Sequence, residues 1–290
     1  LMIKRGIILA GGLGTRLSPI TKSVNKQLLP VYDKPLIFYP LSVLMLSNIR
    51  NVLIIVKKGE KKIFQEVLGN GRDLGIQIEF EEQFKPKGIP EAFLIGEKFI
   101  KDSSVALILG DNFFYGQGLS EILKKSFNIK SGARIFTYPI NNPQNFGIVE
   151  KVNGGKKLRI IEKPKKTRSN LAITGLYVFD KNVVKYSKTI KASKRKETEI
   201  VDLINIYNKK NKLKVTDLGR GSTWLDTGTI ESLLAASNYV QVVEERQKYK
   251  IACLEEIAFS KGWIKKININ NRIKFYGPCN YSKYLKELIN

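Results

Sequence analysis

A glycine-rich turn followed by two cations is the first part of this sequence whose residue types suit chemistry. The segment from 6 to 30 reads GIILAGGLGTRLSPITKSVNKQLLP, and its apolar run ends at Gly11, Gly12 and Gly14. Consecutive backbone N–H groups in such a turn can surround a phosphate. Arg16 and Lys26 add two positive charges close to the turn in sequence. We therefore predict that this loop binds the triphosphate of a nucleotide.

A dinucleotide-binding turn of an oxidoreductase is the main alternative for this loop. The acidic residue expected about 20 positions further on is not evident, because that region contains Lys22, Lys26 and Lys34. A dinucleotide turn does not need Arg16, and no Gly-Lys-Ser/Thr follows, as a Walker-type loop requires. Binding of NAD(P) would support the oxidoreductase alternative.

Two aspartates lie where apolar stretches end and suit a divalent cation. Asp111 stands in LILGDN and Asp226 in WLDTGT. Mg²⁺ prefers carboxylate and phosphate oxygens as ligands. Either aspartate alone could equally cap a turn or a helix, but together with the glycine loop the pair favours metal ligation. We therefore predict Mg²⁺ as the cofactor.

Two charged segments further along could hold a second phosphate and a sugar. Glu162-Lys163-Pro164 follows a predicted strand, and Lys163 is a candidate phosphate ligand, although an ordinary charged turn is the alternative. In KRKETEIVD, Arg195 with Glu197 and Glu199 could bind a phosphate and sugar hydroxyls. The same segment fits the start of a helix with acidic residues in its first turn, and the two interpretations are compatible.

The elements that must position these residues alternate between strand and helix. Strands are predicted at 3–10, 51–56, 76–80 and 105–109, and helices at 35–46, 61–68 and 91–100. Later strands are predicted at 133–138, 147–152, 158–161, 174–179 and 213–218, and helices at 199–209, 230–248 and in the last forty or so residues. Such alternation is typical of a parallel, doubly wound sheet, whose ligands lie beyond the carboxyl ends of the strands.

The composition excludes several classes of protein and of site. The sequence of 290 residues contains no histidine, which excludes histidine catalysis, and only Cys253 and Cys279, which argues against a disulfide framework or a zinc cluster. No apolar run approaches the ~20 residues that span a membrane. The N-terminal apolar segment is interrupted too early for a signal peptide, so we expect a cytoplasmic protein.

The formal net charge of +24 makes a nucleic-acid-binding protein an alternative of another class. Such a protein would gather Lys and Arg on one side and bind RNA or DNA in a salt-sensitive way. The lysines instead form short groups, such as Lys57-Lys58 and Lys165-Lys166, and fit a generally Lys-rich composition. We therefore do not expect a nucleic acid as a partner.

Seven segments in order resemble the sugar-phosphate nucleotidylyltransferase family: LAGGLGTRL, NKQLLPVYDKPLIFYPLSVLML, AFLIGE, LGDN, EKP, TGLYVFD and WLDTGT. The likeness runs from Arg5 to about Leu285. The segments KQLLPVYDKP and IACLEEIAF resemble its glucose-1-phosphate thymidylyltransferase branch. The resemblance implies an α/β fold of the nucleotide-diphospho-sugar transferase type, with a Rossmann-like, mixed, mainly parallel sheet flanked by helices and a helical C-terminal extension.

The resemblance implies Mg²⁺-dependent transfer of a thymidylyl group from dTTP to glucose 1-phosphate, the first step of dTDP-rhamnose synthesis. Direct in-line attack would give dTDP-glucose and pyrophosphate. The sugar phosphate is already anionic, so no general base is needed. A related UTP- or CTP-dependent sugar-1-phosphate nucleotidylyltransferase is the alternative within the class.

The roles that the resemblance implies fall into groups. The catalytic residues would be Arg16, Lys26, Lys163, Asp111 and Asp226, of which Asp111 and Asp226 would hold Mg²⁺. The nucleotide would be bound by Leu9, Gly11, Gly12, Gly14, Thr15, Arg16, Gln27, Gln83, Gly88 and Asp111, with Gln83 reading the pyrimidine edge. The sugar phosphate would be bound by Gly147, Glu162, Lys163, Thr174, Tyr177, Arg195 and Glu197.

The resemblance also implies a division of the chain and a second ligand site. Residues 1–240 would form the catalytic domain, with a nucleotide-binding part at about 1–130 and a sugar-binding part at about 131–228. Residues 241–290 would form a helical segment that makes oligomer and regulatory contacts. A homotetramer with a dTDP-sugar as feedback ligand is implied, and the matching residues are Tyr115, Gly116, Arg220, Lys250 and Glu256.

Three departures from the family pattern lie near the predicted ligands. The family usually has GLAQAF where this chain has GIPEAF at 88–93, so that Pro90 and Glu91 lie beside the base site. Phe146 replaces the usual Tyr before Gly147, and Lys196 replaces the usual Gly. We expect activity to survive these changes and specificity to be open to a shift.

Overall fold

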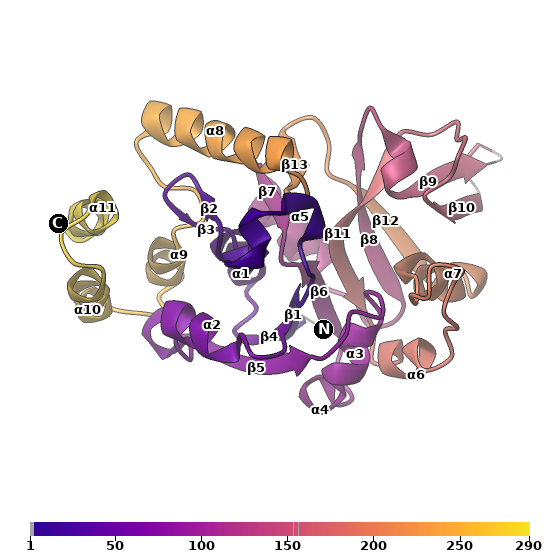
Figure 1. Ribbon diagram of the computed structural model, residues 1–290, viewed down its shortest axis with the longest axis horizontal. Coiled ribbons are helices and arrows are strands. Elements are labelled where there is room, and N and C mark those ends of the chain that lie inside the picture. The colour runs from indigo at the N-terminus through magenta and orange to yellow at the C-terminus, as the bar shows by residue number, and fades with distance from the viewer. Residues whose placement is uncertain (1–2, 153, 156) are drawn as a thin grey trace.

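Strand β1 (Arg5–Ala10) lies in the middle of a mixed sheet and has parallel neighbours on both sides. The computed structural model describes residues 3–152, 154–155 and 157–290. In it the strand order is β10-β9-β11-β6-β1-β4-β5, and β8 pairs with β11 and β12 (Figure 1). The register sets Ile7 beside Leu53 and Leu107, and all three side chains are buried. Strands that are covered on both faces have continuous apolar sequences. These strands could therefore be predicted from the sequence.

The remaining strands extend this sheet or form small sheets beside it. The large sheet also contains β4 (Asn51–Lys57), β5 (Gln77–Gln83), β6 (Val105–Leu109), β8 (Ala133–Pro139), β9 (Gly147–Val152), β10 (Lys157–Glu162), β11 (Leu171–Phe179) and β12 (Leu213–Asp217). The small sheets are β2 (Pro30–Val31) with β3 (Lys34–Pro35), and β7 (Asn112–Gly116) with β13 (Ser222–Asp226). Strand β11 is antiparallel to β6, β8 and β9, so the predicted mixed α/β sheet is confirmed.

Helices cover both faces of the sheet. One buried cluster joins it to α1 (Phe38–Leu46), α2 (Lys61–Leu68), α5 (Leu119–Ser126), α9 (Leu254–Ser260), α10 (Lys266–Tyr276) and α11 (Asn280–Ile289). A second cluster on the other face joins it to α3 (Glu91–Ile95), α4 (Glu97–Ile100), α6 (Val183–Ser187) and α7 (Ile200–Lys209). Helix α8 (Ile230–Gln247) packs on β2 and β13. No helix among the described residues is long and apolar enough to cross a membrane.

Most predicted elements are present, with small differences at their ends. The predicted helix at 35–46 begins at Phe38, because Pro35 pairs with Pro30 in the β2–β3 hairpin. The predicted helix at 91–100 is two helices separated at Gly96. Strand β7 and helices α5 and α6 were not predicted, because their short segments show no long apolar period.

The C-terminal helices form a layer at one end of the molecule, furthest from β9 and β10 (Figure 1). The buried carboxylate of Glu255 in α9 accepts hydrogen bonds from Arg272 Nε at 2.9 Å, Tyr276 Oη at 2.8 Å and Tyr281 Oη at 2.6 Å. A buried charge is tolerated where it is paired and hydrogen-bonded. This one carboxylate therefore connects α9 to α10 and α11.

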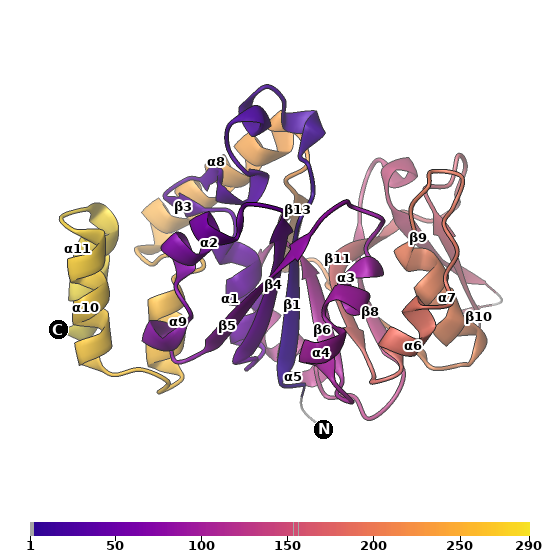
Figure 2. The same cartoon turned by 60° about the horizontal axis from the view of Figure 1, so that its bottom comes forward.

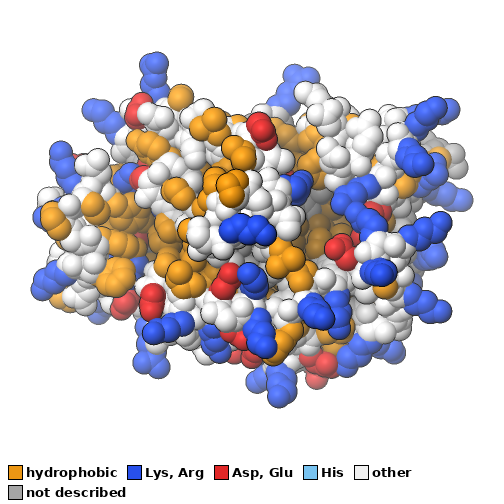
Figure 3. Space-filling view, viewed as in Figure 1, with side chains coloured by type: hydrophobic (Ala, Val, Ile, Leu, Met, Phe, Trp, Pro, Cys, Tyr) orange, Lys and Arg blue, Asp and Glu red, His pale blue; other side chains and the backbone are white. Residues whose placement is uncertain are grey.

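The cationic side chains are spread over the face seen in Figure 3, with blue Lys and Arg along most of its outline. The predicted glycine loop lies beyond the upper end of β1 in Figure 2, whereas the N-terminus lies at the opposite end. Strand β6 runs parallel to β1, and Gly110 at its end donates a backbone hydrogen bond to Leu9 O at 2.9 Å. The fold therefore brings the loop and Asp111 to the same edge of the sheet.

Candidate active site

The glycine loop leaves backbone donors free at the end of β1. Gly14 adopts a φ of 61° and precedes a short 3₁₀ turn, Thr15–Leu17. A Cβ on Gly14 would lie 2.9 Å from Thr21 Cγ2, so both the conformation and the space favour glycine here. Among the described residues, no acceptor is found for the N–H groups of Gly12, Leu13 and Gly14. These donors can therefore bind an anion, as predicted for a phosphate.

Lys26 and the two predicted metal ligands come together beside this loop. Lys26 is buried, and its Nζ lies 2.6 Å from Asp111 Oδ2. Asp226 is the last residue of β13 and pairs in register with Asn112, which follows Asp111 directly. The backbone N–H and hydroxyl of Thr227 donate to Asp111 O at 3.0 and 2.8 Å. Two segments more than a hundred residues apart thus place both carboxylates at one point.

Arg16 reaches the same point from the glycine loop. Its guanidinium lies against Gly228, where a Cβ would come 2.6 Å from Nη2. A side chain at position 228 would therefore displace the Arg16 guanidinium from its present place. Arg16 lines the same cavity as Asp111 and Asp226, and its charge acts on Asp226.

Asn112 is a site residue that was not predicted from the sequence. Its side chain is 2% exposed, and Oδ1 accepts hydrogen bonds from Trp224 Nε1 at 2.6 Å and from the Gly175 backbone N–H at 2.9 Å. Its Nδ2 donates to Asp111 Oδ1 at 3.0 Å. Asn112 therefore orients the carboxylate of Asp111 and connects three strands. In the sequence, the only indication of this role was that a polar residue directly follows Asp111 in LGDN.

The two aspartates differ in their electrostatic surroundings. Burial alone would raise the pKa of Asp111, but the Lys26 ammonium outweighs it and holds the pKa of that carboxyl below its usual value. Burial raises the pKa of Asp226 to about 6, and the negative charge of Asp111 adds to the rise. The charges of Lys26 and Arg16 lower the pKa of Asp226 by less than burial and Asp111 raise it. A bound cation would therefore favour ionisation of Asp226.

The residues present fit the predicted Mg²⁺. Asp111 and Asp226 offer hard oxygen ligands, and the raised pKa of Asp226 marks a place where a cation would be favourable. No three Asp, Glu, Cys or His side chains gather as a metal cage in the part of the chain that the structure describes. Two carboxylates would leave further ligand positions to phosphate oxygens and water, which is how Mg²⁺ is often bound in nucleotide enzymes.

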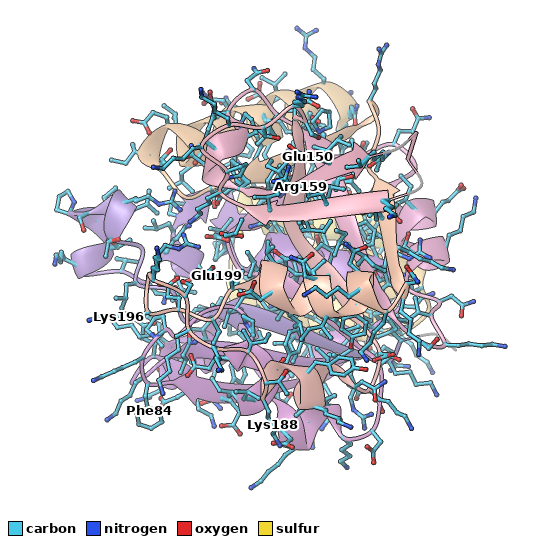
Figure 4. The ribbon with its side chains drawn as sticks, turned by 90° about the vertical axis from the view of Figure 1, so that its right-hand side faces the viewer. Phe84, Glu150, Arg159, Lys188, Lys196 and Glu199 are labelled. Atoms are coloured by element: carbon cyan, nitrogen blue, oxygen red, sulfur yellow. The ribbon has the colours of Figure 1, made fainter. Side chains whose placement is uncertain are left out.

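A cavity of about 660 Å³ opens beside these carboxylates. Its lining includes Arg16, Asp111, Asp226, Gly147, Glu162, Lys163 and Tyr177. Burial raises the pKa of Glu162, against the opposing effect of its hydrogen bond from Arg195. Arg195 Nη2 lies 3.0 Å from Glu162 Oε1 and 2.7 Å from Glu199 Oε2, the latter at the start of α7 (Figure 4). Most of the predicted sugar-phosphate residues therefore line or border one cavity.

Thr174 and Glu197 lie apart from the other predicted sugar-phosphate residues. Thr174 is fully buried and its hydroxyl donates to Phe136 O at 3.2 Å, whereas Ile173, Gly175 and Tyr177 line the cavity. Successive side chains of a strand point to opposite faces, so Thr174 faces away. Glu197 lines a smaller neighbouring cavity instead.

This smaller cavity, of about 190 Å³, is lined by several of the predicted nucleotide-binding residues. Its lining includes Leu9, Gly12, Gln27, Gln83, Gly88 and Asp111. Gln27 Oε1 is buried and has no hydrogen-bond partner among the described residues. Buried polar atoms are usually paired, so this acceptor favours a ligand that supplies a donor. The cavity adjoins the larger one at Asp111, which lines both.

Hydrogen bonds join the loop that contains Lys87 and Gly88 to the loop that contains Thr198. The backbone N–H of Thr198 donates to Lys87 O at 2.7 Å, and its hydroxyl donates to the same oxygen at 2.9 Å. Gly88 has a φ of 112°, and a Cβ there would lie 2.0 Å from Thr198 O. The loop with Gln83 and Gly88 and the loop with Arg195 and Glu197 are therefore packed on each other.

The predicted regulatory residues lie at a third cavity, of about 270 Å³. Tyr115, Gly116, Lys250 and Glu256 line it, and Arg220 does not. Burial raises the pKa of Glu256, whose Oε2 accepts a hydrogen bond from Tyr284 Oη at 2.7 Å. The cavity lies between β7 and α9, apart from the carboxylate pair.

Comparison with known proteins agrees with this geometry. The family model described as nucleotidyl transferase matches residues 5–242. A glucose-1-phosphate thymidylyltransferase of Neisseria gonorrhoeae is 49% identical over 285 residues, which cover 98% of this chain and 99% of that protein. One of Mycobacterium tuberculosis is 45% identical with the same coverage. A Bacillus anthracis crystal structure assigned to this class, in complex with a sucrose, is 36% identical and covers 81% of this chain and 94% of its own, with a TM-score of 0.74.

Proposed function

The chain belongs to the nucleotidyl transferase family, and on that premise we propose that it transfers a thymidylyl group from dTTP to glucose 1-phosphate. The products are dTDP-glucose and pyrophosphate. The observation that carries the proposal is the meeting of Arg16, Lys26, Asp111 and Asp226 beside two adjoining cavities. One cavity fits the size of a base and the other fits a sugar phosphate.

The reaction requires several phosphate charges to approach one another. Two unit charges at 4 Å repel by roughly 4 kcal/mol at an effective dielectric constant of 20. Arg16 and Lys26 offset this repulsion from the nucleotide side, and Lys163 and Arg195 offset it from the sugar-phosphate side. Phosphoryl transfer depends mainly on positioning and charge stabilisation. These four cations supply both.

Arg16 and the free N–H groups of the glycine loop bind the pyrophosphate that leaves. Lys26 Nζ forms an ion pair with Asp111 Oδ2 at 2.6 Å, which positions its positive charge near the α-phosphorus. Asp111 and Asp226 would hold Mg²⁺, which when bound would supply further charge neutralisation at the phosphates. Asn112 keeps the Asp111 carboxylate in place through its Nδ2.

The sugar phosphate attacks the α-phosphorus directly, without a covalent enzyme intermediate. Glu162 and Tyr177 lie where they can contact the hexose, and Lys163 orients its phosphate. No Cys lines the 660 Å³ cavity among the described residues, and the sequence contains no His. An anionic phosphate oxygen needs no general base, since its proton is already lost.

A matrix of nucleoside triphosphates and sugar 1-phosphates tests the proposal. Pyrophosphate release with Mg²⁺ should be fastest for dTTP with glucose 1-phosphate. A preference of about a hundredfold for UTP or CTP, or roughly 2.7 kcal/mol, would move the chain to another branch of the family. Incubation with α-³²P-labelled dTTP and no sugar phosphate should leave the protein unlabelled.

The remaining proposals concern assembly and regulation. We propose a cytoplasmic homotetramer that carries out the first step of dTDP-rhamnose synthesis, since its proposed substrates are made in the cytoplasm. Residues 1–240 form its catalytic domain, and residues 241–290 make oligomer and regulatory contacts. A dTDP-sugar binds the 270 Å³ cavity between β7 and α9 as a feedback ligand. Sedimentation of the protein tests the proposed homotetramer. Equilibrium binding of dTDP-sugars to a Glu256→Gln variant tests the proposed feedback site.

A further inference from the structure

Glu150 in β9 binds the loop 163–170, which joins β10 to β11 on opposite sides of β9 in the sheet. Thr167 Oγ1 donates to Glu150 Oε1 at 2.8 Å, and the backbone N–H of Arg168 donates to the same oxygen at 3.3 Å. The hydrogen bond from Thr167 lowers the pKa of Glu150 below its usual value. Glu150 is therefore an ionised acceptor at neutral pH, and it attaches the second half of the loop to β9.

The first residue of the loop is attached beside the same strand. The backbone N–H of Lys163 donates to Phe146 O at 3.0 Å, directly before β9 begins. Lys163 has a φ of 42° although Pro164 follows it, whereas a residue before proline normally has a negative φ and an extended backbone. A strained backbone of this kind persists only where the surrounding structure holds it. The attachments at Phe146 and Glu150 supply this restraint.

The cations of this loop are divided between two cavities. Lys163 lines the 660 Å³ cavity that contains the two aspartates. Lys166 and Arg168 line a separate surface cavity of about 610 Å³, and Glu150 lies among them there. A lysine side chain has a flexible four-carbon stem, so the backbone of the loop decides which cavity each ammonium can reach. The place of Glu150 therefore matters for the direction of Lys163.

We propose that Glu150 is a positioning residue for the sugar-phosphate side of the reaction, because its bonds to Thr167 and Arg168 fix the loop with Lys163 directed into the 660 Å³ cavity. Glu150 is not among the residues that line this cavity and acts through Lys163. The inference rests on the proposed function, which gives Lys163 its anionic ligand, the phosphate of a sugar 1-phosphate.

The second partner of Glu150 provides a matched control. Arg159 lies opposite Glu150 in the register of β9 and β10, and its Nη1 is 3.5 Å from Glu150 Oε2 (Figure 4). The Arg159 side chain is 69% exposed, and exposed ion pairs contribute little to stability. Arg159→Met therefore removes a partner of the same carboxylate and leaves both bonds to the loop in place.

Steady-state kinetics of pyrophosphate release tests the inference. Leu has no acceptor, so Glu150→Leu should raise KM for glucose 1-phosphate at least about fivefold and change KM for dTTP less than about twofold. Thr167→Val, which removes the donor from the loop, should give the same pattern. Glu150→Gln keeps an accepting oxygen and Thr167→Ser keeps the hydroxyl, so each should restore most of the affinity for glucose 1-phosphate. Arg159→Met should keep both wild-type constants.

A double-mutant cycle separates positioning of Lys163 from a general loss of structure. Glu150→Leu should lower kcat/KM for glucose 1-phosphate at least about fivefold in the wild-type background, but less than about twofold in the Lys163→Ala background. A structural role alone would lower it by the same factor in both. Hydrogen exchange followed by mass spectrometry, without substrate, should show faster exchange at 165–170 in Glu150→Leu than in wild type or Arg159→Met.

Three results would overturn the inference. They are a KM for glucose 1-phosphate within about twofold of wild type in Glu150→Leu, an equal loss in both backgrounds of the cycle, or unchanged exchange at 165–170. The proposed function fails differently, through absence of pyrophosphate release by the wild-type protein with every triphosphate and sugar 1-phosphate. Because hydrogen exchange needs no turnover, the attachment of the loop by Glu150 is measured in either case.

Discussion

Replacing Asn112 by Leu would remove the polar centre that connects the two aspartate-bearing segments. Asn112 Oδ1 is the acceptor for Trp224 Nε1 and for the Gly175 backbone N–H, at 2.6 and 2.9 Å. Leu has a similar volume but no polar atom. Both donors would remain buried without a partner, and the Asp111 carboxylate would lose one of its hydrogen bonds.

The expected loss of stability follows from these contacts. A buried polar group without a partner costs about 1–3 kcal/mol, so two orphaned donors should lower the free energy of unfolding by about 2–6 kcal/mol. This is a large part of the about 5–15 kcal/mol that stabilises typical proteins. The loss should appear as a lower urea midpoint with an unchanged slope.

Urea unfolding, followed by circular dichroism and by tryptophan fluorescence, measures this loss. The sequence contains only two Trp, and one of them is the donor to Asn112, so the fluorescence reports directly on the site. Asn141→Leu on the exposed surface is the matched control and should change the midpoint little. A loss below about 1 kcal/mol for Asn112→Leu would refute the reasoning, because both donors would then have found other partners.

Four further outcomes are expected. Arg16→Ala should lower kcat/KM at least about tenfold, or roughly 1.4 kcal/mol, in a pyrophosphate-release assay; a smaller effect would contradict its leaving-group role. Asp226→Asn should abolish most Mg²⁺-stimulated turnover, and equal stimulation in both proteins would count against metal ligation. Because a proton and the cation compete for Asp226, whose pKa is about 6, the Mg²⁺ concentration for half-maximal rate should rise as the pH falls through that value; a flat titration would contradict this. Gly11→Ala places a Cβ 2.3 Å from Gln83 Oε1, so KM should rise more for dTTP than for glucose 1-phosphate; equal changes would argue against a base-site effect.

The central sheet could be predicted because burial on both faces leaves a direct mark on the sequence. The runs before Gly11 and Asp111 are continuously apolar, and they are the neighbouring parallel strands β1 and β6. Ligand sites at the carboxyl ends of such strands follow from the topology. The glycine loop and the first aspartate were therefore accessible from the sequence.

The partners of the site residues were not accessible in this way. Asn112 and Trp224 are 112 positions apart, and no local pattern indicates that an amide would accept a hydrogen bond from that indole. Gln83 and Glu91 are only eight positions apart, but the loop between them has no regular period. Their contact depends on how that loop folds, which local spacing does not determine.

Thr174 illustrates a limit of the motif. It was predicted near the hexose because it stands in TGLYVFD, yet its hydroxyl donates to the backbone Phe136 O of the neighbouring strand β8. The alternation of β11 gives the cavity Ile173, Gly175 and Tyr177 instead. A motif identifies the segment, whereas the pleat of the strand selects which of its residues can touch a ligand.

The hydrogen bonds from Thr198 to Lys87 O have a thermodynamic consequence. They join the loop beside the base cavity to the loop that carries Arg195, so a ligand that restricted one loop would lower the entropic cost of restricting the other. Binding of the two proposed substrates would then be linked, and linkage is reciprocal. The factor by which the nucleotide improves affinity for the sugar phosphate must equal the factor by which the sugar phosphate improves affinity for the nucleotide.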